Sequence, residues 1–491
     1  MQKFLARRYR RGTCVLVVCL GVLAGLGFAR VSGDGQLWLC WGMALPLLAV
    51  WRKQNMALLV LLLVFGATIG WWRGSVYLRT LGAYEPLYLH ATTLSVQASE
   101  DAVYGKTKQM SFTADHITLP SGRVLTGKIQ VSGFGANAIF QGDELRVTGK
   151  LYPGYGAYQG RLSFALINVV QHHTTLVATI RRNFVAGTQS ALPEPLAPFV
   201  MGLLVGQRAT LPQDVKDDLQ KVGLTHIIAV SGYNLTIILQ ASRRVLGKRS
   251  KRLSTFLSLV LIAVFLLLAG ASASIVRAAI VSMVSIATAY YGRSFQPLSL
   301  ICFAAAITAY ADPVYIWSDL SWYLSFLAFF GVMIVSPLMQ ARWPGKWHQN
   351  IVGAVALESV CAEMMSLPFV LYIFGQMSLV GLPANILVVT MVPLAMLLGV
   401  VAGLAGMLAP AIAGWFSWPA KELLNYMLDT AHIIAHLPHI FIENRSLPLQ
   451  YMLALYLLIA LFCLSLRHKT KHAKPAIITD IKEPMYRGLL A

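Results

Sequence analysis

Residues 219–240 form an apolar stretch about as long as one membrane crossing, LQKVGLTHIIAVSGYNLTIILQ, that contains polar residues. Polar side chains at membrane depth are costly, so they usually face a cavity or a partner helix. Glycine beside asparagine also disfavours an uninterrupted helix. We therefore expect a polar, broken element inside a helical membrane bundle, where transport pathways tend to lie. The residues we expect along such a path here are His226, Ser231, Gly232, Tyr233 and Asn234.

Composition supports a membrane location for most of the chain. The 491 residues are 57% hydrophobic and only 12% charged, whereas a soluble chain is about one quarter charged. Long apolar runs recur, and most approach the roughly 20 residues that a helix needs to cross about 30 Å of hydrocarbon. These runs are Thr13–Val31, Met56–Trp72, Leu253–Ala271, Pro297–Ala311, Trp317–Pro337 and Tyr451–Leu466.

The predicted fold class is a polytopic α-helical membrane protein with about 12 spans. Basic residues cluster before the first span, in residues 243–252 and after the last span, which is typical of cytoplasmic segments. We therefore place the chain in a membrane with both termini cytoplasmic, although the 243–252 loop could also contact an anionic partner. Residues 195–206 are too short to span and are expected to lie in the interface or re-enter. The spans are expected near 13–31, 36–51, 55–72, 222–240, 253–272, 274–291, 297–311, 317–338, 350–375, 378–408 (crossing twice) and 448–466.

Four domains follow from the change in pattern along the chain. Residues 1–72 carry three spans, 73–190 form an extracytoplasmic domain, 191–466 form a helical channel-type domain and 467–491 form a basic tail. In 73–190, short alternating runs are separated by turn signals, which predicts a small β-barrel of the OB-like type. The predicted strands are Thr93–Ser99, Gln109–Leu119, Arg123–Val131, Glu144–Leu151 and Leu162–Val169.

The predicted outer domain carries aromatic and basic residues close together in sequence. OB folds often bind single strands through aromatic platforms and a basic groove. The same aromatics would also suit a loop that packs on the barrel or on lipid headgroups. The candidate DNA contacts are Lys150, Tyr152, Tyr155, Tyr158 and Arg161.

Ionisable residues also occur within the later apolar segments. Arg277 lies among small residues, and a buried arginine costs at least ~2.5–3.5 kcal/mol at mid-helix unless it is paired or solvated. It could form a structural ion pair that fixes helix packing, or it could line an anion pathway. Glu358 and Glu363 are five positions apart and cannot share a helix face closely. The possible partners of Arg277 in this block are Asp319, Glu358 and Glu363. Asn385 is a further candidate, because it follows Pro383 in a candidate broken helix.

Near the C-terminus, one helix face carries Asp429, His432, His436 and His439. A metal site is possible there, but an amphipathic helix at the outer surface accounts for the pattern, and we expect neither a metal nor a cofactor. The sequence contains no GxxxxGK[ST], HExxH or GxSxG motif. Ser231 and His226 are five positions apart with no orienting acid nearby, so we do not expect an enzyme.

Four segments in order resemble the ComEC competence family, the inner-membrane channel for DNA uptake. They are FVMGLLVGQRATLPQDVKDDLQKVGLTHIIAVSGYN (199–234), LAGASASIVRAAI (268–280), DPVYIWSDLSWYLSFLAFFGV (312–332) and MMSLPFVLYIFGQMSLVGLPANILVV (364–389). Residues 73–190 resemble the outer OB-like domain of that family less sharply, best in GDELRVTGKLYP (142–153). Many family members carry His where this chain has Asn234. They also carry an outer-domain cysteine pair and a C-terminal metallo-β-lactamase-like domain, which this sequence lacks, so strand degradation is expected to be absent.

The resemblance implies that single-stranded DNA passes inward through this chain. It also implies contact with membrane lipid and with other competence proteins, such as an outer DNA receptor and a cytoplasmic motor, and it allows a homo-oligomer. Two other hypotheses stay open from the residues themselves. A secondary transporter of a small anionic solute would use the same broken polar helices, and an intramembrane enzyme would use Ser231 and His226.

Overall fold

The structure is a computed structural model, and it places the chain in two compact units. One unit contains Met1–Ala178 with Phe295–Tyr323, and the other contains Thr179–Ser294 with Leu324–Ala491. The residues that the structure describes are 11–32, 56–100, 102–104, 109–135, 139–156, 158–172, 176–206, 211–228, 251–269, 273–291, 296–341, 351–443 and 446–471.

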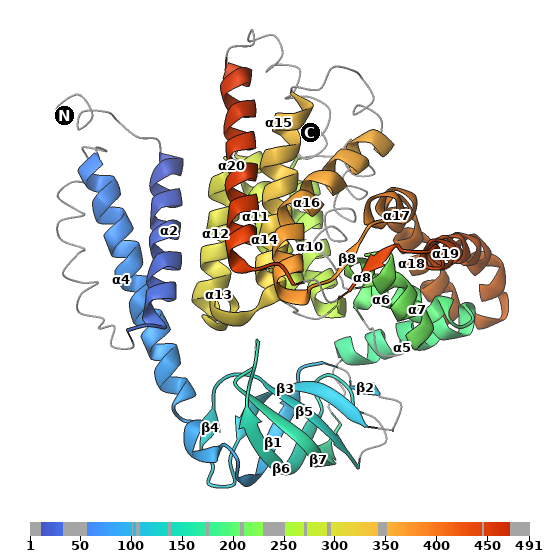
Figure 1. Cartoon of the computed structure of the whole chain (residues 1–491). Helices are drawn as coiled ribbons and strands as arrows, with labels where there is room; N and C mark the ends of the chain where they lie inside the picture. The colour runs from blue at the N-terminus through green and yellow to red at the C-terminus, as the bar shows by residue number, and fades with distance from the viewer. Residues whose placement is uncertain are drawn as a thin grey trace. The chain divides into compact units, whose positions relative to one another are not determined.

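Two glycine-lined helices, α2 (Arg11–Ala29) and α4 (Met56–Leu81), lie side by side in the first unit (Figure 1). A Cβ atom added to Gly25 would lie 2.0 Å from the carbonyl oxygen of Ala67, and one added to Gly70 would lie 2.1 Å from that of Val22. The two backbones therefore approach closely, as small residues allow in membranes. The short apolar helix α12 (Pro297–Ala311) packs on α2.

A strand-rich domain follows α4 in the first unit (Figure 1). All five predicted strand segments contain strands, and the third is divided into two. The strands are β1 (Ala91–Ala98), β2 (Val103–Tyr104), β3 (Met110–Thr118), β4 (Val124–Leu125), β5 (Ile129–Phe134), β6 (Glu144–Pro153) and β7 (Gly160–Gln171). Their alternating side chains form one buried core that includes Leu94, Ile129 and Val147. Alternation of apolar and polar residues thus predicted a strand-rich domain correctly, although α4 runs to Leu81 and α5 begins at Leu176, inside the predicted range 73–190.

The strands pair along the order β1-β6-β7-β5-β3-β2. β1 is antiparallel both to β6 and to β3, with Leu94 opposite Val147 in the first pair and Gln97 opposite Asp115 in the second. β7 is antiparallel to β6 and parallel to β5. Each of the five long strands therefore has two neighbours among the other long strands.

The second unit is almost entirely helical. It begins with α5 (Leu176–Ala191) and α6 (Leu196–Val205), and all ten residues of α6 are buried. That burial favours a segment enclosed by protein over one that lies in the membrane interface. The next elements are α7 (Gln213–Lys221), α8 (Thr225–Ile228), α10 (Lys251–Ala269), α11 (Ala273–Tyr290), α14 (Leu320–Phe330), a π-helical turn (Gly331–Val335) and α15 (Ser336–Gln340). The last are α16 (Ile351–Phe374), β8 (Met377–Ser378), α17 (Gly381–Val388), α18 (Val392–Leu408), α19 (Ala413–Ala435), β9 (Phe441–Ile442) and α20 (Leu449–Lys471).

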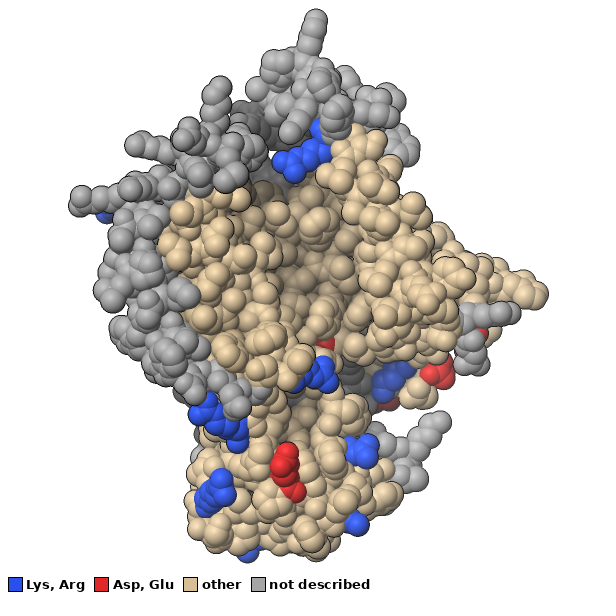
Figure 2. Space-filling model, turned by 60° about the vertical axis from the view of Figure 1, so that its left-hand side comes forward, with Lys and Arg blue, Asp and Glu red and all other residues tan. Residues whose placement is uncertain are grey.

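Six helices in the described ranges are long and apolar enough to cross a membrane. Their outer faces keep large apolar side chains exposed, and on α20 the side chains of Leu457 and Leu458 are 62% and 61% exposed. Figure 2 shows a broad surface without Lys, Arg, Asp or Glu over the helices, and charged side chains over the strand-rich domain. An exposed apolar surface of this extent indicates a membrane protein.

Most of the predicted spans that the structure describes contain long helices, but the predicted number of spans lacks support. Residues 36–51 and 229–240 lie outside the described residues, and residues 222–228 contain only the four-residue helix α8. In 378–408, α17 and α18 together form one candidate span, Gly381–Leu408, whereas the sequence predicted two crossings. The eight residues of α17 rise only about 12 Å, so α17 cannot cross by itself. The total of about 12 spans therefore stays a prediction.

Candidate translocation site

The described part of 219–240 contains a helix break at Gly223. α7 ends at Lys221, Gly223 takes a left-handed φ of +77°, and α8 begins at Thr225. Glycine adopts this conformation without steric cost. The predicted break at Ser231, Gly232, Tyr233 and Asn234 lies outside the described residues. His226 is exposed on α8, and its Nδ1 donates to the carbonyl oxygen of Gly223 over 3.2 Å.

Residues from three later elements lie against this break. A Cβ on Gly223 would lie 3.2 Å from Cβ of Ser378 and 3.5 Å from Cα of Gly381. A Cβ on Gly381 would in turn lie 3.2 Å from a carboxylate oxygen of Glu363. The structure therefore places Glu363 of α16 and the first residue of α17 beside the break, and Asn385 follows one turn later on α17.

Three polar residues near the break were not identified from the sequence. Nε2 of Gln220 donates to Oε1 of Gln376 over 3.2 Å, which connects the end of α7 to the segment after α16. The third residue is Ser378, whose Oγ is buried without a hydrogen-bond partner among the described residues. The same is true of Oδ1 of Asn385, which the sequence did identify as a candidate. The segment IFGQMSLVGLPAN, with small and polar residues between apolar ones, was the signal that could have identified Gln376 and Ser378.

Buried oxygens without partners are uncommon because each costs about 1–3 kcal/mol. Two of them beside a helix break, together with the Glu363 carboxylate, make this part of the bundle locally hydrophilic. We refer to Gly223, Glu363, Ser378, Gly381 and Asn385 as the break cluster. Water or a polar solute could satisfy its free oxygens, which is the chemistry that a hydrated path requires.

Arg277 has a different environment. It lies on α11, its side chain is buried at 1% exposure, and its guanidinium carbon lies 5.9 Å from the ring centroid of Phe326 on α14. The neighbouring residues Ala278 and Ala279 belong to a buried apolar cluster formed with α10. A cation over an aromatic ring is stabilised by about 2 kcal/mol or more when it is desolvated.

The structure separates the candidate acids. Asp319 lies in the first unit, where its Oδ1 accepts from the backbone N–H and the hydroxyl of Ser321 at 2.9 and 2.8 Å. It is therefore the N-cap of α14, and this accounts for an aspartate at that position. Glu358 is half-buried on α16, five residues before Glu363, so the two side chains point about 140° apart.

Four of the five candidate residues of the strand-rich domain form one cluster. Tyr152 of β6 lies directly opposite Arg161 of β7. The Arg161 guanidinium carbon lies 5.9 Å from the ring centroid of Tyr152 and 5.6 Å from that of Tyr155, and Nζ of Lys150 lies 5.8 Å from that of Tyr152. The side chain of Tyr155 is 60% exposed. The cluster thus offers an exposed aromatic face next to two cations.

Tyr158 does not join this cluster. Its hydroxyl shares a 3.3 Å hydrogen bond with the hydroxyl of Thr113 on β3, and burial raises the pKa of the phenol above its usual range. The loop that contains it is also fixed on both sides. The Ser318 hydroxyl donates to the Gly156 carbonyl, and the Gln159 side chain contacts Tyr77 and the Lys128 backbone N–H. Tyr158 therefore packs on the strand-rich domain, which the sequence left open as the alternative to a DNA contact.

Comparison with known proteins connects these features to a family. A family profile described as Competence protein matches residues 203–469, more than half of the chain, and this range includes the whole break cluster. ComE operon protein 3 of Bacillus subtilis (strain 168) is 27% identical over 246 residues, which are 49% of this chain and 31% of that protein. The match therefore spans about a third of the relative's length, and no solved structure matches. The chain belongs to the Competence protein family.

Proposed function

We propose that this chain is a channel subunit that passes single-stranded DNA into the cytoplasm during natural transformation. The observation that carries the proposal is the break cluster, because it places polar groups of α16, β8 and α17 near the helix break at Gly223, within the family-matched region. A polyanion cannot cross hydrocarbon bare and needs a polar, hydrated path that binds it weakly. His226 and the residues 231–234 would extend this path, and Arg277 would supply a cation elsewhere in its lining.

The strand-rich domain would be the outer receiving surface. Its strand pairing supports an OB-like barrel, because β1 pairs with both β3 and β6 and β5 runs parallel to β7. Bases can stack on Tyr152 and Tyr155 while Lys150 and Arg161 neutralise phosphates. This contact would be insensitive to sequence, because every base has a flat face to stack.

The proposed location is the bacterial inner membrane, with both termini cytoplasmic and the strand-rich domain outside. Membrane lipid surrounds the helices, an outer DNA receptor delivers the strand and a cytoplasmic motor pulls it, because the sequence has no phosphate-binding loop of its own. Copies of the chain could associate within the membrane. The family suggests a non-enzymatic channel, and it favours DNA over a small anionic solute as the cargo.

The outer contact can be tested with purified full-length protein in detergent. Tyr155→Ala and Arg161→Ala each remove one part of the aromatic–cationic cluster, whereas the control Tyr158→Phe changes a tyrosine of the same loop outside it. Stacking contributes about 1–3 kcal/mol per base, so we expect roughly 5- to 150-fold weaker binding of a fluorescent oligothymidine in the first two variants. Arg161→Ala should also flatten the salt dependence of binding.

Transformation frequency in cells gives the second readout for the same variants. Both cluster variants should lower it, with membrane abundance equal to that of the wild type. Equal oligonucleotide binding by Tyr155→Ala, Tyr158→Phe and the wild type would remove the outer contact from the proposal. If a deletion strain that carries the wild-type gene takes up DNA no better than the deletion strain itself, the proposed function is wrong.

A further inference from the structure

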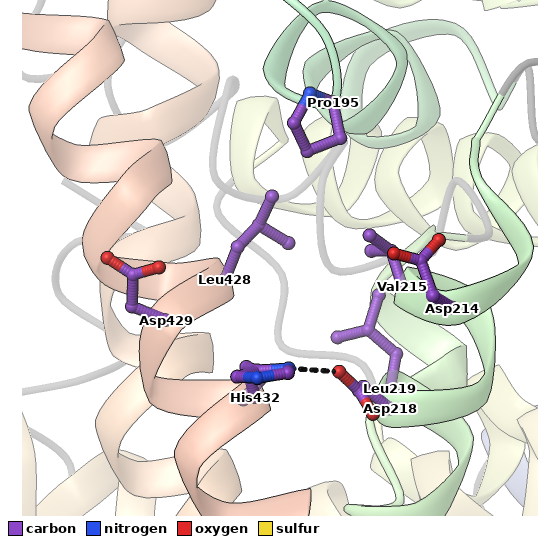
Figure 3. A pocket seen from close by; sticks show the side chains of 9 residues that line it. Pro195, Asp214, Val215, Asp218, Leu219, Leu428, Asp429 and His432 are labelled. Atoms are coloured by element: carbon purple, nitrogen blue, oxygen red, sulfur yellow. Dashed lines mark hydrogen bonds and ion pairs between the residues drawn. The ribbon is translucent and has the colours of Figure 1, made fainter.

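A cluster of two histidines and one aspartate lies between α7 and α19, outside the break cluster. His432 and His436 are one turn apart at the C-terminal end of α19, which places them on the same helix face. Asp218 of α7 faces them, and its Oδ2 accepts a 2.7 Å hydrogen bond from Nδ1 of His432 (Figure 3). The helical spacing of the histidines was visible in the sequence, but the third residue comes from a segment 214 positions away.

The hydrogen bonds orient the second histidine for metal binding. Nδ1 of His436 lies 2.8 Å from the carbonyl oxygen of His432. A carbonyl oxygen can only accept, so this Nδ1 carries the proton and Nε2 keeps its lone pair. Metal-binding histidines commonly donate their other ring N–H in this way. The two ring centroids are 4.2 Å apart, and one ligand atom from each of the three side chains lies within 4.8 Å of the others.

A cavity of about 150 Å³ adjoins the cluster, and its lining favours a cation. Asp214 and Asp429 line it together with Asp218 and His432, and the described lining contains no lysine or arginine. Figure 3 shows these residues on facing helices. The apolar side chains of Leu219 and Leu428 lie between them, so the carboxylates sit beside a partly apolar wall. Low polarity strengthens the attraction between these carboxylates and a positive ion.

We propose that Asp218, His432 and His436 bind a divalent late first-row transition-metal ion, with Zn²⁺ as the preferred ion. Imidazole nitrogen with one carboxylate oxygen is a ligand set suited to Zn²⁺, whereas Mg²⁺ and Ca²⁺ select oxygen ligands. Bonds of about 2.0–2.2 Å place tetrahedral ligand atoms roughly 3.3–3.6 Å apart, so the present separations, which are all within 4.8 Å, would shorten when the ion binds. The side chain of His432 is 62% exposed, which leaves a fourth position open to water.

The ion would connect α7 to α19. α7 ends two residues before Gly223, so the metal would hold the helix that leads directly into the helix break. Its expected effect is greater stability of the packing between α7 and α19. The site is independent of the cargo and would stand even if the chain carried something other than DNA.

Metal binding can be measured on the purified full-length protein in detergent after treatment with a chelator. We expect one equivalent of Zn²⁺ to bind to the wild type, and Co²⁺ in its place to give visible absorption bands of a four-coordinate site. His432→Gln and His436→Gln should each weaken Zn²⁺ binding at least tenfold, as should Asp218→Asn. The matched control is His439→Asn, an exposed histidine beyond the end of α19 at φ +59°, where asparagine is tolerated.

Thermal unfolding provides a second readout. Zn²⁺ should raise the unfolding temperature of the wild type and of His439→Asn, but not that of the His432→Gln/His436→Gln double variant. The double variant must give the same monodisperse elution profile as the wild type without metal. Equal Zn²⁺ stoichiometry and affinity in the wild type and in this folded double variant would overturn the proposal, and so would equal affinity of the wild type for Mg²⁺ and Zn²⁺.

Discussion

At the scale of single residues, substitutions of Arg277 can show whether its buried charge serves helix packing or DNA passage. Its guanidinium is buried over Phe326, and methionine keeps a long, flexible side chain there without the charge. The membrane abundance of Arg277→Met is measured first, and its transformation is compared with that of the wild type at equal abundance. If the charge serves DNA passage, the transformation frequency of this variant should fall at least a hundredfold, as should that of Arg277→Ala.

Arg277→Lys is the companion variant, because it keeps the charge and loses the planar guanidinium. It should retain more transformation than Arg277→Met. Wild-type transformation by Arg277→Met, measured at equal abundance, would assign this residue to helix packing alone.

Asn385 supports a second prediction at this scale. Its side-chain oxygen is buried without a hydrogen-bond partner among the described residues, so Asn385→Leu removes a polar group that the fold does not use. Thermal stability in detergent should stay equal or rise by about 1 kcal/mol. Transformation should fall at least tenfold because the hydrophilic surface beside Gly223 is interrupted.

The control for Asn385 is Ser366→Ala on α16, whose hydroxyl already donates to the Ala362 carbonyl at 3.0 Å. It should transform like the wild type. Unchanged transformation in Asn385→Leu would remove this residue from the proposed path.

At the scale of elements, the packing of α2 on α4 depends on glycine. A Cβ at Gly25 would meet the Ala67 carbonyl oxygen, which belongs to the backbone and cannot rotate away. Gly25→Ala should therefore force the helices apart and destabilise this pair by about 1–3 kcal/mol. Heating the purified protein and measuring the fraction that stays soluble should show a lower midpoint.

Gly27→Ala is the matched control, because a Cβ at Gly27 meets nothing within 4 Å. Its midpoint should equal or exceed that of the wild type, since alanine favours helix more than glycine. Equal midpoints for Gly25→Ala and Gly27→Ala would contradict the close packing of α2 on α4.

Elements were more predictable than the contacts between them. The strands were found from alternation and turn residues, and the described spans from apolar length, because both are local properties. The break at Gly223 was not predicted, because glycine is tolerated in many helices and only the fold shows its left-handed φ of +77° and the close approach of Ser378. The separation of Tyr158 from Tyr155 depends on Thr113, which lies 45 positions from Tyr158. The pairing of Asp218 with His432 also depends on tertiary packing that periodicity does not encode.

At the scale of the whole molecule, the proposed orientation can be tested by labelling. Val170 of β7 is 59% exposed, and Arg467 is exposed near the end of α20. If the strand-rich domain is outside and the C-terminus is inside, a membrane-impermeant maleimide should label Val170→Cys in intact cells. Arg467→Cys should be labelled only after permeabilisation.

The wild-type chain measures the background in the same cells, because all five cysteines that the structure describes are free thiols and two of them, Cys19 and Cys361, are buried. Labelling of Arg467→Cys in intact cells would reverse the proposed orientation of the last helix.

The contacts that hold Gly156 and Gln159 bear on how fast a strand would be taken up at the proposed outer surface. The Gly156 carbonyl accepts a hydrogen bond from Ser318, and the Gln159 side chain is hydrogen-bonded to Tyr77 and to the Lys128 backbone N–H. If bases stack on Tyr155 as proposed, a preorganised surface would lose little conformational entropy when a base arrives, and capture would need no slow rearrangement. Successive nucleotides would then be bound and released at nearly constant affinity, as a moving strand requires.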